Sequence, residues 1–152
     1  MPAIGVDLGG TKCLGALVDD DGTIRDLHRV PTPVGADAIL AAVEGVAQEL
    51  VGRAGVTVDG VGVGVPGLVD RGGVLRFAPN LPGVIDLPVG ATLSDRLGLP
   101  VVVENDASAA GWGERQAGAA RGRDNCILVT LGTGIGGGIV VDGGLYRGTH
   151  GF

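Results

Sequence analysis

The chain has 152 residues and a formal net charge of −6, from 17 acidic and 11 basic residues. This acidic surplus argues against nucleic acid or an anionic membrane as the main partner. Hydrophobic residues make up 45% of the chain and charged residues 18%, a balance typical of a folded protein rather than a disordered one. No apolar run reaches the roughly 18 residues that a membrane-spanning helix needs without charges or repeated glycines, so we predict none.

Two cysteines, Cys13 and Cys126, lie inside apolar runs far apart in the chain. They have no metal-ligand spacing, and we interpret both as buried, reduced thiols, which favours a cytoplasmic protein. The first ten residues lack the basic segment and the long apolar core of a secretory signal peptide.

Three strands are predicted at the start of the chain, over Ala3–Leu8, Cys13–Val18 and Thr23–Val30. The segment "DDDG" between the last two ends in Asp-Gly, which is typical of a hairpin turn. We therefore expect an antiparallel arrangement, with Pro31 ending the third strand.

An amphipathic helix is predicted over Asp37–Ala54, where apolar residues recur at steps of three and four. Two buried strands follow, "VDGVGVGVPG" at Val58–Gly67 and "PVVVEND" at Pro100–Asp106. The residues after Arg76 are rich in proline, so we predict a loop there, with a short helix near Thr92–Leu97.

The last part of the chain repeats the opening pattern after an alanine-rich helix at Ala107–Ala119. A strand, a Thr-Gly turn, a second strand and an Asp-Gly turn follow in order. We therefore predict a complete lobe over residues 1–122 and the first strands of a similar second lobe over residues 123–152. These strands would present an uncovered apolar face, so we expect a piece of a longer protein; the residues concerned are Ile127, Val129, Leu131, Ile139, Val140 and Val141.

Two glycine-rich turns are candidates for binding phosphate, "DLGGTK" at Asp7–Lys12 and "LGTGIGG" at Leu131–Gly137. Glycine lets the backbone approach an anion closely, and such turns donate several N–H groups in one direction. Asp7 is placed to hold Mg²⁺, mainly through water, because this ion keeps much of its hydration. An ordinary structural hairpin turn is the alternative interpretation.

Two segments match the G-x-G-x-x-G pattern of dinucleotide-binding sites, at Gly62 and at Gly132. That pattern must open a helix directly after a strand. A Gly-Gly segment follows the first match, and a strand and a turn follow the second. We therefore exclude a nicotinamide site.

The segment "ENDA" at Glu104–Ala107 follows an apolar strand. Ligands usually bind at the carboxyl ends of strands in α/β sheets, so Asn105 and Asp106 are candidates for chemistry. Asp106 could also be the N-cap of the following helix. The two roles are compatible, but capping alone explains neither Glu104 nor Asn105.

Five segments together resemble the ROK family, named for repressors, open reading frames and sugar kinases. They occur in the family's order: "DLGGTK", "GVGVPGLVD", "APNLPG", "ENDASAAGWGE" and "LGTGIGGGIVVDGGLYRG". Within the family, the chain looks most like the bacterial ATP-dependent glucokinases. The resemblance covers essentially the whole chain and implies an α/β fold of the actin-like ATPase (ribonuclease H-like) class, with a mixed sheet.

The resemblance implies a role for each segment. Asp106 would be the general base that takes the proton from the 6-hydroxyl of a hexose. The sugar would be held by Asn80, Asn105 and the backbone at Gly67. The phosphates of ATP would lie on two turns and Mg²⁺ on Asp7; the residues of the turns are Gly9, Gly10, Thr11, Lys12, Gly132, Thr133 and Gly134.

The implied activity is the phosphorylation of a hexose, most of all glucose to glucose 6-phosphate, by a full-length protein that forms a homo-oligomer. The family's structural zinc site, its adenosine pocket and a sugar-binding Glu and His would follow Phe152. We therefore expect residues 1–152 alone to be inactive. The family also often has a tryptophan where this chain has Val84, which bears on the wall of the sugar pocket.

Two other functions stay open. A sugar-responsive ROK regulator would carry a helix-turn-helix domain ahead of the first strand, and the strand expected at Ala3 argues against it. An actin-like ATPase without a sugar substrate would not need the "APNLPG" and "ENDA" segments.

Overall fold

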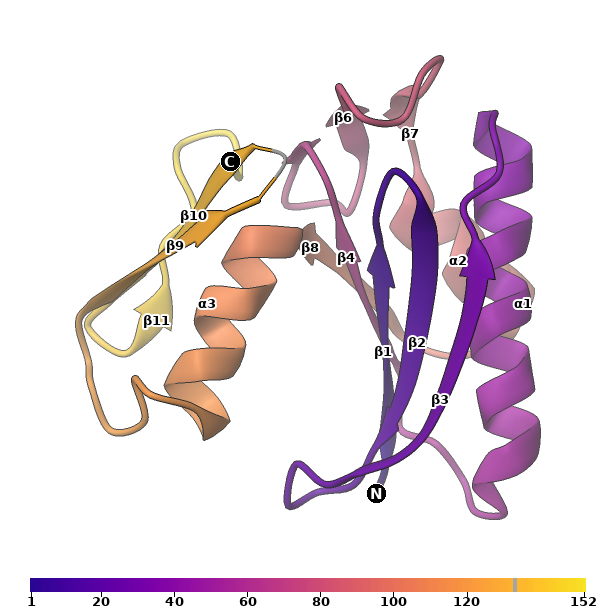
Figure 1. Cartoon of the computed structure of the whole chain (residues 1–152), viewed down its shortest axis with the longest axis horizontal. Helices are drawn as coiled ribbons and strands as arrows, with labels where there is room; N and C mark the ends of the chain where they lie inside the picture. Colours follow the sequence, from indigo (N-terminus) through magenta and orange to yellow (C-terminus); the bar gives the residue numbers. More distant parts are fainter. Residues whose placement is uncertain (133) are drawn as a thin grey trace.

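The first sheet of the fold has five strands. The computed structural model describes residues 1–132 and 134–152. The strand order is β3-β2-β1-β4-β8, with β1, β2 and β3 antiparallel and with β4 and β8 parallel to β1 (Figure 1). The predicted α/β fold with a mixed sheet is therefore confirmed. The strands are β1 (Ala3–Leu8), β2 (Lys12–Val18), β3 (Ile24–Pro31), β4 (Val61–Val65) and β8 (Val101–Asn105).

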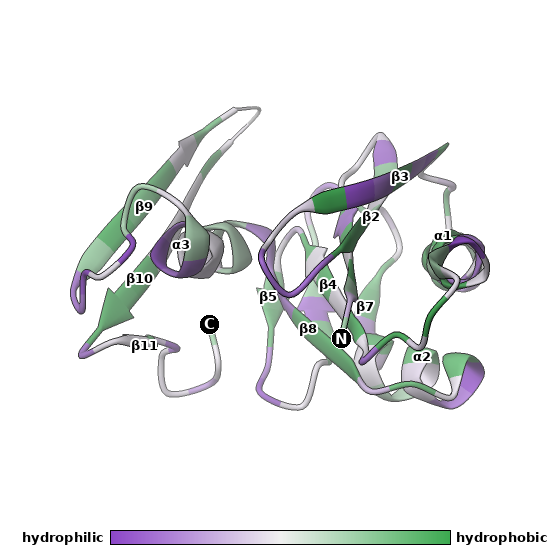
Figure 2. Cartoon of the chain, turned by 90° about the horizontal axis from the view of Figure 1, so that it is seen from below, coloured by the Kyte–Doolittle hydropathy of each residue, from purple (hydrophilic) through white to green (hydrophobic). Residues whose placement is uncertain are grey.

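Two helices, α1 (Ala36–Ala54) and α2 (Val89–Leu97), cover one face of this sheet (Figures 1 and 2). Side chains on β1 alternate, so that every second one is buried beneath these helices. The contact between α1 and β2 depends on Gly15, because a Cβ there would lie 2.7 Å from Cδ1 of Leu50. The main apolar core of the chain lies on this side of the sheet.

A small second sheet was not predicted. It consists of β5 (Leu68–Val69), β6 (Leu75–Phe77) and β7 (Ile85–Leu87), the last inside the expected proline-rich loop. Strands of two or three residues are too short to show a period in the sequence. Asp70 holds the β5–β6 turn, since its carboxylate accepts hydrogen bonds from the amides of Gly72 and Val74.

A third sheet follows helix α3 (Asp106–Ala117) and contains β9 (Cys126–Leu131), β10 (Ile135–Val141) and β11 (Gly144–Leu145). Helix α3 lies between this sheet and the first one (Figures 1 and 2). It packs closely on β10, because a Cβ on Gly111 would lie only 3.2 Å from Cα of Gly138.

The apolar residues of the third sheet that were expected to be uncovered are not all exposed. Val140 is buried, on the side of β10 that faces α3, which corrects its place in the predicted exposed set. The other face of the sheet is indeed open, and its exposed side chains are Ile127, Val129, Leu131, Ile135, Ile139 and Val141. The lobe boundary after residue 122 lies between α3 and β9 and stays a prediction.

Several element bounds differ from those predicted. The third strand includes Pro31, which pairs with Lys12. Strand β3 is at the edge of its sheet, where a missing N–H breaks no internal ladder bond. The buried strand expected from Val58 is shorter, and α2 begins earlier, at Val89. In the part of the chain that the structure describes, no helix is long and apolar enough to span a membrane.

The two cysteines are not equally buried. Both are free thiols, with Cys13 buried and Cys126 half-buried, so the expectation holds for the first only. Burial, with a smaller contribution from the charge of Asp7, raises the pKa of Cys13 to about 11. Its thiol is therefore protonated at neutral pH and acts as a small apolar side chain of the core.

Candidate active site

A cleft of about 860 Å³ opens between the first sheet and α3. Its floor is the face of β1 and β4 that points away from α1, where Gly5, Gly62 and Gly64 leave the backbone bare. Helix α3 forms the wall, with Trp112 at its edge. Among the described residues that line the cleft, the charged ones are Asp7, Glu104, Asp106 and Arg147.

Asp106 is the first residue of α3, at the carboxyl end of β8. It is not the N-cap that the sequence suggested as an alternative. Asn105 has the extended backbone of a cap, and its Oδ1 accepts a hydrogen bond from the Ser108 amide at 3.0 Å. The carboxylate of Asp106 accepts from the Ala107 amide at 2.8 Å and is exposed. It is therefore available to a ligand in the cleft.

The structure brings Asn105 and Gly67 together, as the resemblance implied. Nδ2 of Asn105 donates to the carbonyl of Gly67 at 3.1 Å and to Oδ1 of Asp106 at 3.1 Å. Gly67 has a φ of 121°, and a Cβ there would overlap the carbonyl of Phe77. Only glycine fits this position, which fixes the carbonyl that Asn105 reaches.

The first glycine turn joins β1 to β2 and is closed by its own backbone. The Gly9 amide donates to the Lys12 carbonyl at 2.8 Å, so it is already engaged within the turn. Thr32 braces the turn from β3, since its Oγ1 donates to the Gly9 carbonyl at 2.7 Å and its amide donates to the Thr11 carbonyl at 3.0 Å. Thr32 was missed, because a threonine between two prolines carries no local signal for this contact.

Asn80 lies directly against this turn. A Cβ on Gly10 would lie 3.0 Å from the Asn80 carbonyl oxygen, so the expected phosphate loop and an expected sugar ligand are in contact. Val84, in contrast, is buried in the core, so it is not an exposed counterpart of the family's tryptophan.

Asp7 lies on β1 and lines the cleft, and its pKa is raised. Burial is the main cause, and the negative charge of Asp106 adds to it, while Lys12 opposes both. Two carboxylates that repel each other in one cleft suit a hard cation. The described residues contain no group of three or more metal-ligating side chains, so a Mg²⁺ ion at Asp7 would need water and nucleotide oxygens as its other ligands.

The second glycine turn joins β9 to β10. The Gly132 amide donates to the Gly134 carbonyl at 2.9 Å, and the predicted ligand Thr133 lies outside the described residues. In Figure 1, the adjoining ends of β9 and β10 lie at the same end of the molecule as the β1–β2 turn. The N-terminus of α3 lies between them.

The comparisons with known proteins agree with the fold and the motif order. The family model described as ROK family matches residues 3–152. A glucokinase of Streptomyces coelicolor is 46% identical over 97% of this chain and 46% of its own length. The xylose repressor of Bacillus subtilis is 32% identical over 99% of this chain and 40% of its own length.

Solved structures give the same result. A ROK family glucokinase from Streptomyces griseus, in complex with glucose and AMPPNP, superimposes with a TM-score of 0.87 at 44% identity, over 99% of this chain and 48% of that one. The chain thus spans about half the length of the relatives that it matches. With the family model matched over nearly every residue, the chain belongs to the ROK family.

Proposed function

We propose that residues 1–152 form the first half of an ATP- and Mg²⁺-dependent hexose kinase, with glucose as the preferred sugar. The observation that carries the proposal is the Asn105–Asp106 pair at the end of β8. An exposed carboxylate is held there by the neighbouring amide, in a cleft that it shares with Asp7. Phosphoryl transfer to a hydroxyl needs mainly positioning, charge stabilisation and a base, and this cleft offers each of them.

In the proposed reaction, Asp106 accepts the proton of the sugar 6-hydroxyl as that oxygen attacks the γ-phosphate of ATP. The bond between the γ-phosphorus and the bridging oxygen breaks, and ADP leaves. Nδ2 of Asn105 orients the carboxylate through the 3.1 Å hydrogen bond to Oδ1. Asn80, Asn105 and the backbone at Gly67 are the groups that we propose to bind the sugar hydroxyls. A Mg²⁺ ion near Asp7 would neutralise charge on the phosphates.

The two glycine turns hold the phosphates in this proposal. The residues concerned are Gly9, Gly10, Thr11 and Lys12 in the first turn and Gly132, Thr133 and Gly134 in the second. Because the Gly9 and Gly132 amides are engaged within their own turns, the remaining amides of each turn are the candidate donors. The adenosine pocket, the zinc site and the homo-oligomer contacts of the resemblance would involve the second half.

The preference for glucose is supported by the 46% identity to a glucokinase. The similarity to a xylose repressor keeps a sugar-responsive regulator as the second candidate, because repressors and kinases share this region.

The test is a coupled phosphorylation assay on the full-length protein, with glucose, mannose and xylose offered separately, each with and without Mg²⁺-ATP. We expect ADP release that requires both Mg²⁺ and a hexose, and is fastest with glucose. ADP release independent of any sugar would indicate an actin-like ATPase. Sugar binding without ADP release would indicate the regulator.

A further inference from the structure

Glu104 and Arg147 form an ion pair to which the proposed chemistry gives no role. Nε of Arg147 lies 2.6 Å from Oε2 of Glu104. Glu104 is on β8, directly before the Asn105–Asp106 pair, whereas Arg147 follows β11 in the third sheet. The ion pair therefore connects the first sheet, next to the candidate base, with a segment 43 residues further along the chain.

The burial of Glu104 makes the pair more than a surface contact. Its side chain is 12% exposed, against 41% for Arg147. Exposed ion pairs contribute little, but a largely buried carboxylate is costly when its partner is removed. Asp7 and Asp106 face the same cleft, and Arg147 is the single cation among the described residues that line it. Removing Arg147 would leave the side chain of Glu104 without its cationic partner, in a cleft that two other acidic side chains also line.

The second oxygen of Glu104 links the pair to the candidate base. Oε1 of Glu104 accepts a hydrogen bond from the backbone N–H of Asn105 at 3.0 Å. The side chain of Asn105 caps α3 through Ser108 and donates to Asp106. A continuous series of contacts thus runs from Arg147 through Glu104 and Asn105 to the carboxylate of Asp106.

We propose that Arg147 is a positioning residue. By pairing with Glu104, it fixes Asn105 and the carboxylate of Asp106 in the orientation that proton transfer requires. The proposal rests on the proposed function for its catalytic consequence. It also makes the geometry of the base depend on a residue from the segment after β11, and not only on β8 and α3.

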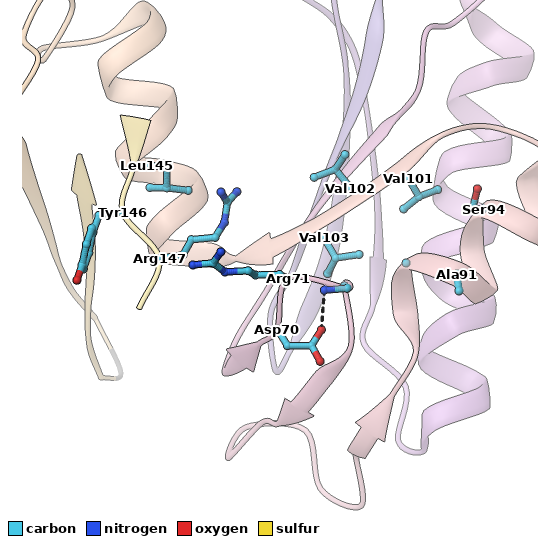
Figure 3. A pocket seen from close by; sticks show the side chains of 13 residues that line it. Asp70, Arg71, Ala91, Ser94, Val101, Val102, Val103, Leu145, Tyr146 and Arg147 are labelled. Atoms are coloured by element: carbon cyan, nitrogen blue, oxygen red, sulfur yellow. Dashed lines mark hydrogen bonds between the residues drawn. The ribbon is translucent and has the colours of Figure 1, made fainter. Parts of the chain in front are cut away.

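Arg71 supplies a matched control. Figure 3 shows Arg71 and Arg147 together in the space between β8 and the segment after β11. Nη2 of Arg71 donates to the carbonyl of Gly148 at 3.2 Å, so it holds the same segment without touching Glu104. An Arg71→Met variant therefore loosens the segment and keeps the Glu104 pair, whereas Arg147→Met removes the pair.

The kinetic experiment uses the full-length protein with the variants Arg147→Met, Arg147→Lys, Glu104→Gln and Arg71→Met. Misplacing a reacting group by about 1 Å can cost about 100-fold, so we expect Arg147→Met to lower kcat at least about tenfold. The KM for ATP should stay within about twofold, since neither Glu104 nor Arg147 belongs to the two glycine turns that are proposed to hold the phosphates. The contact is made by Nε, and the amine of lysine reaches one bond further, so Arg147→Lys should retain most of the activity.

The double variant Glu104→Gln/Arg147→Met should be no worse than the more damaged single variant, because both remove one interaction. Arg71→Met should stay close to wild type. A loss of kcat in Arg71→Met equal to that in Arg147→Met would overturn the proposal, as would additive losses in the double variant.

A second readout needs no activity. Hydrogen exchange of the backbone amides of Asn105 and Ser108, measured on residues 1–152, reports local opening between β8 and α3. The exchange should accelerate at least about tenfold in Arg147→Met and remain unchanged in Arg71→Met. If the full-length protein phosphorylates no sugar but this exchange pattern is found, the proposed function fails and the positioning role stands. Unchanged exchange in Arg147→Met overturns the positioning role whatever the kinetics show.

Discussion

The two faces of the first sheet are built from the same strands and serve opposite purposes. On β1, Ile4, Val6 and Leu8 point toward α1 and α2 and are almost fully buried. The residues between them, Gly5 and Asp7, point into the cleft on the other side. A strand places successive side chains on opposite faces, so one short segment supplies both a core layer and a cleft floor.

The difference between the faces lies in side-chain size and charge. On the face of the sheet that α1 covers (the α1 face), apolar side chains of the strands pack against buried side chains of the helix, such as Val43, Val46 and Leu50. The cleft face has glycines, which leave room for a ligand, and carboxylates, of which Asp7 has a pKa raised by burial and, to a smaller extent, by the charge of Asp106. The face that α1 covers accounts for stability. The cleft face carries the proposed chemistry, and its glycines and carboxylates lower stability.

The largest expected effect is on the cleft face, in Asp106→Asn of the full-length protein. The amide keeps the shape but cannot accept the proton, and a positioned base contributes roughly 10²–10⁴ in rate. This corresponds to about 3–5 kcal/mol of barrier. Glucose affinity should stay within a few-fold and the free energy of unfolding should hardly change. If the variant kept more than about a tenth of the wild-type kcat, Asp106 would be a binding group and not the base.

On the opposite face, Leu50→Ala should lower the free energy of unfolding of residues 1–152 by about 2–5 kcal/mol, because Leu50 is fully buried. Val102→Ala is the matched control, since Val102 is exposed on the cleft side and its truncation should cost less than about 0.5 kcal/mol. Urea denaturation measures both. Equal losses would show that the cleft face is part of the core.

The glycine turns allow a finer separation within the cleft. Gly10→Val should weaken both nucleotide and glucose binding, because a Cβ at this position would be only 3.0 Å from the Asn80 carbonyl oxygen. Gly132→Ala should weaken nucleotide binding alone, by about tenfold, or about 1.4 kcal/mol. Apart from its two chain neighbours, no described residue lies within 4 Å of a Cβ at Gly132, so the fold should tolerate the substitution. Calorimetric titrations of each ligand would distinguish the two; a loss of glucose affinity in Gly132→Ala would count against the phosphate role of the second turn.

The smallest effect expected is a gain in stability from Asp7→Asn. The pKa of Asp7 in the folded protein is raised above its ordinary value of 3.8. Its protonated form is therefore favoured by folding, and this contribution is lost as the pH rises through the raised pKa. At neutral pH, Asp7→Asn should be slightly more stable than the wild type, because the amide carries no charge that burial and Asp106 disfavour.

The control for Asp7→Asn is pH. Well below pH 3.8 this gain should vanish, because Asp7 is then protonated in both the folded and the unfolded chain. Denaturation in the absence of Mg²⁺ at both pH values measures it. A variant that is less stable at neutral pH would show that the carboxylate of Asp7 is structurally required.

The features that could be predicted from the sequence are local ones. Alternation identified β1 and β2, a helical period identified α1, and the order of motifs led to Asp106 and Asn105. The sequence suggested Asp106 as the N-cap of α3, whereas the cap is Asn105, one residue earlier. Asn and Asp are both good caps, and only the backbone angles distinguish them.

Contacts between distant segments could not be predicted. The brace from Thr32 to Gly9 and the pair between Glu104 and Arg147 depend on how the elements pack. The burial of Val140 likewise depends on α3, which reaches β10 through two glycines at Gly111 and Gly138. None of these has a period or a spacing that a single sequence reveals.

We propose that the sugar binds on the cleft face of the first sheet, and that the opposite face, covered by α1, only supports it. Amide chemical shifts of the full-length protein during a glucose titration test this most directly. We expect the shifts to concentrate at Gly67, Asn80, Asn105 and Asp106, while the amides of Val46 and Leu50 stay unchanged. Shifts centred on α1, or none at the end of β8 when glucose is saturating, would contradict it.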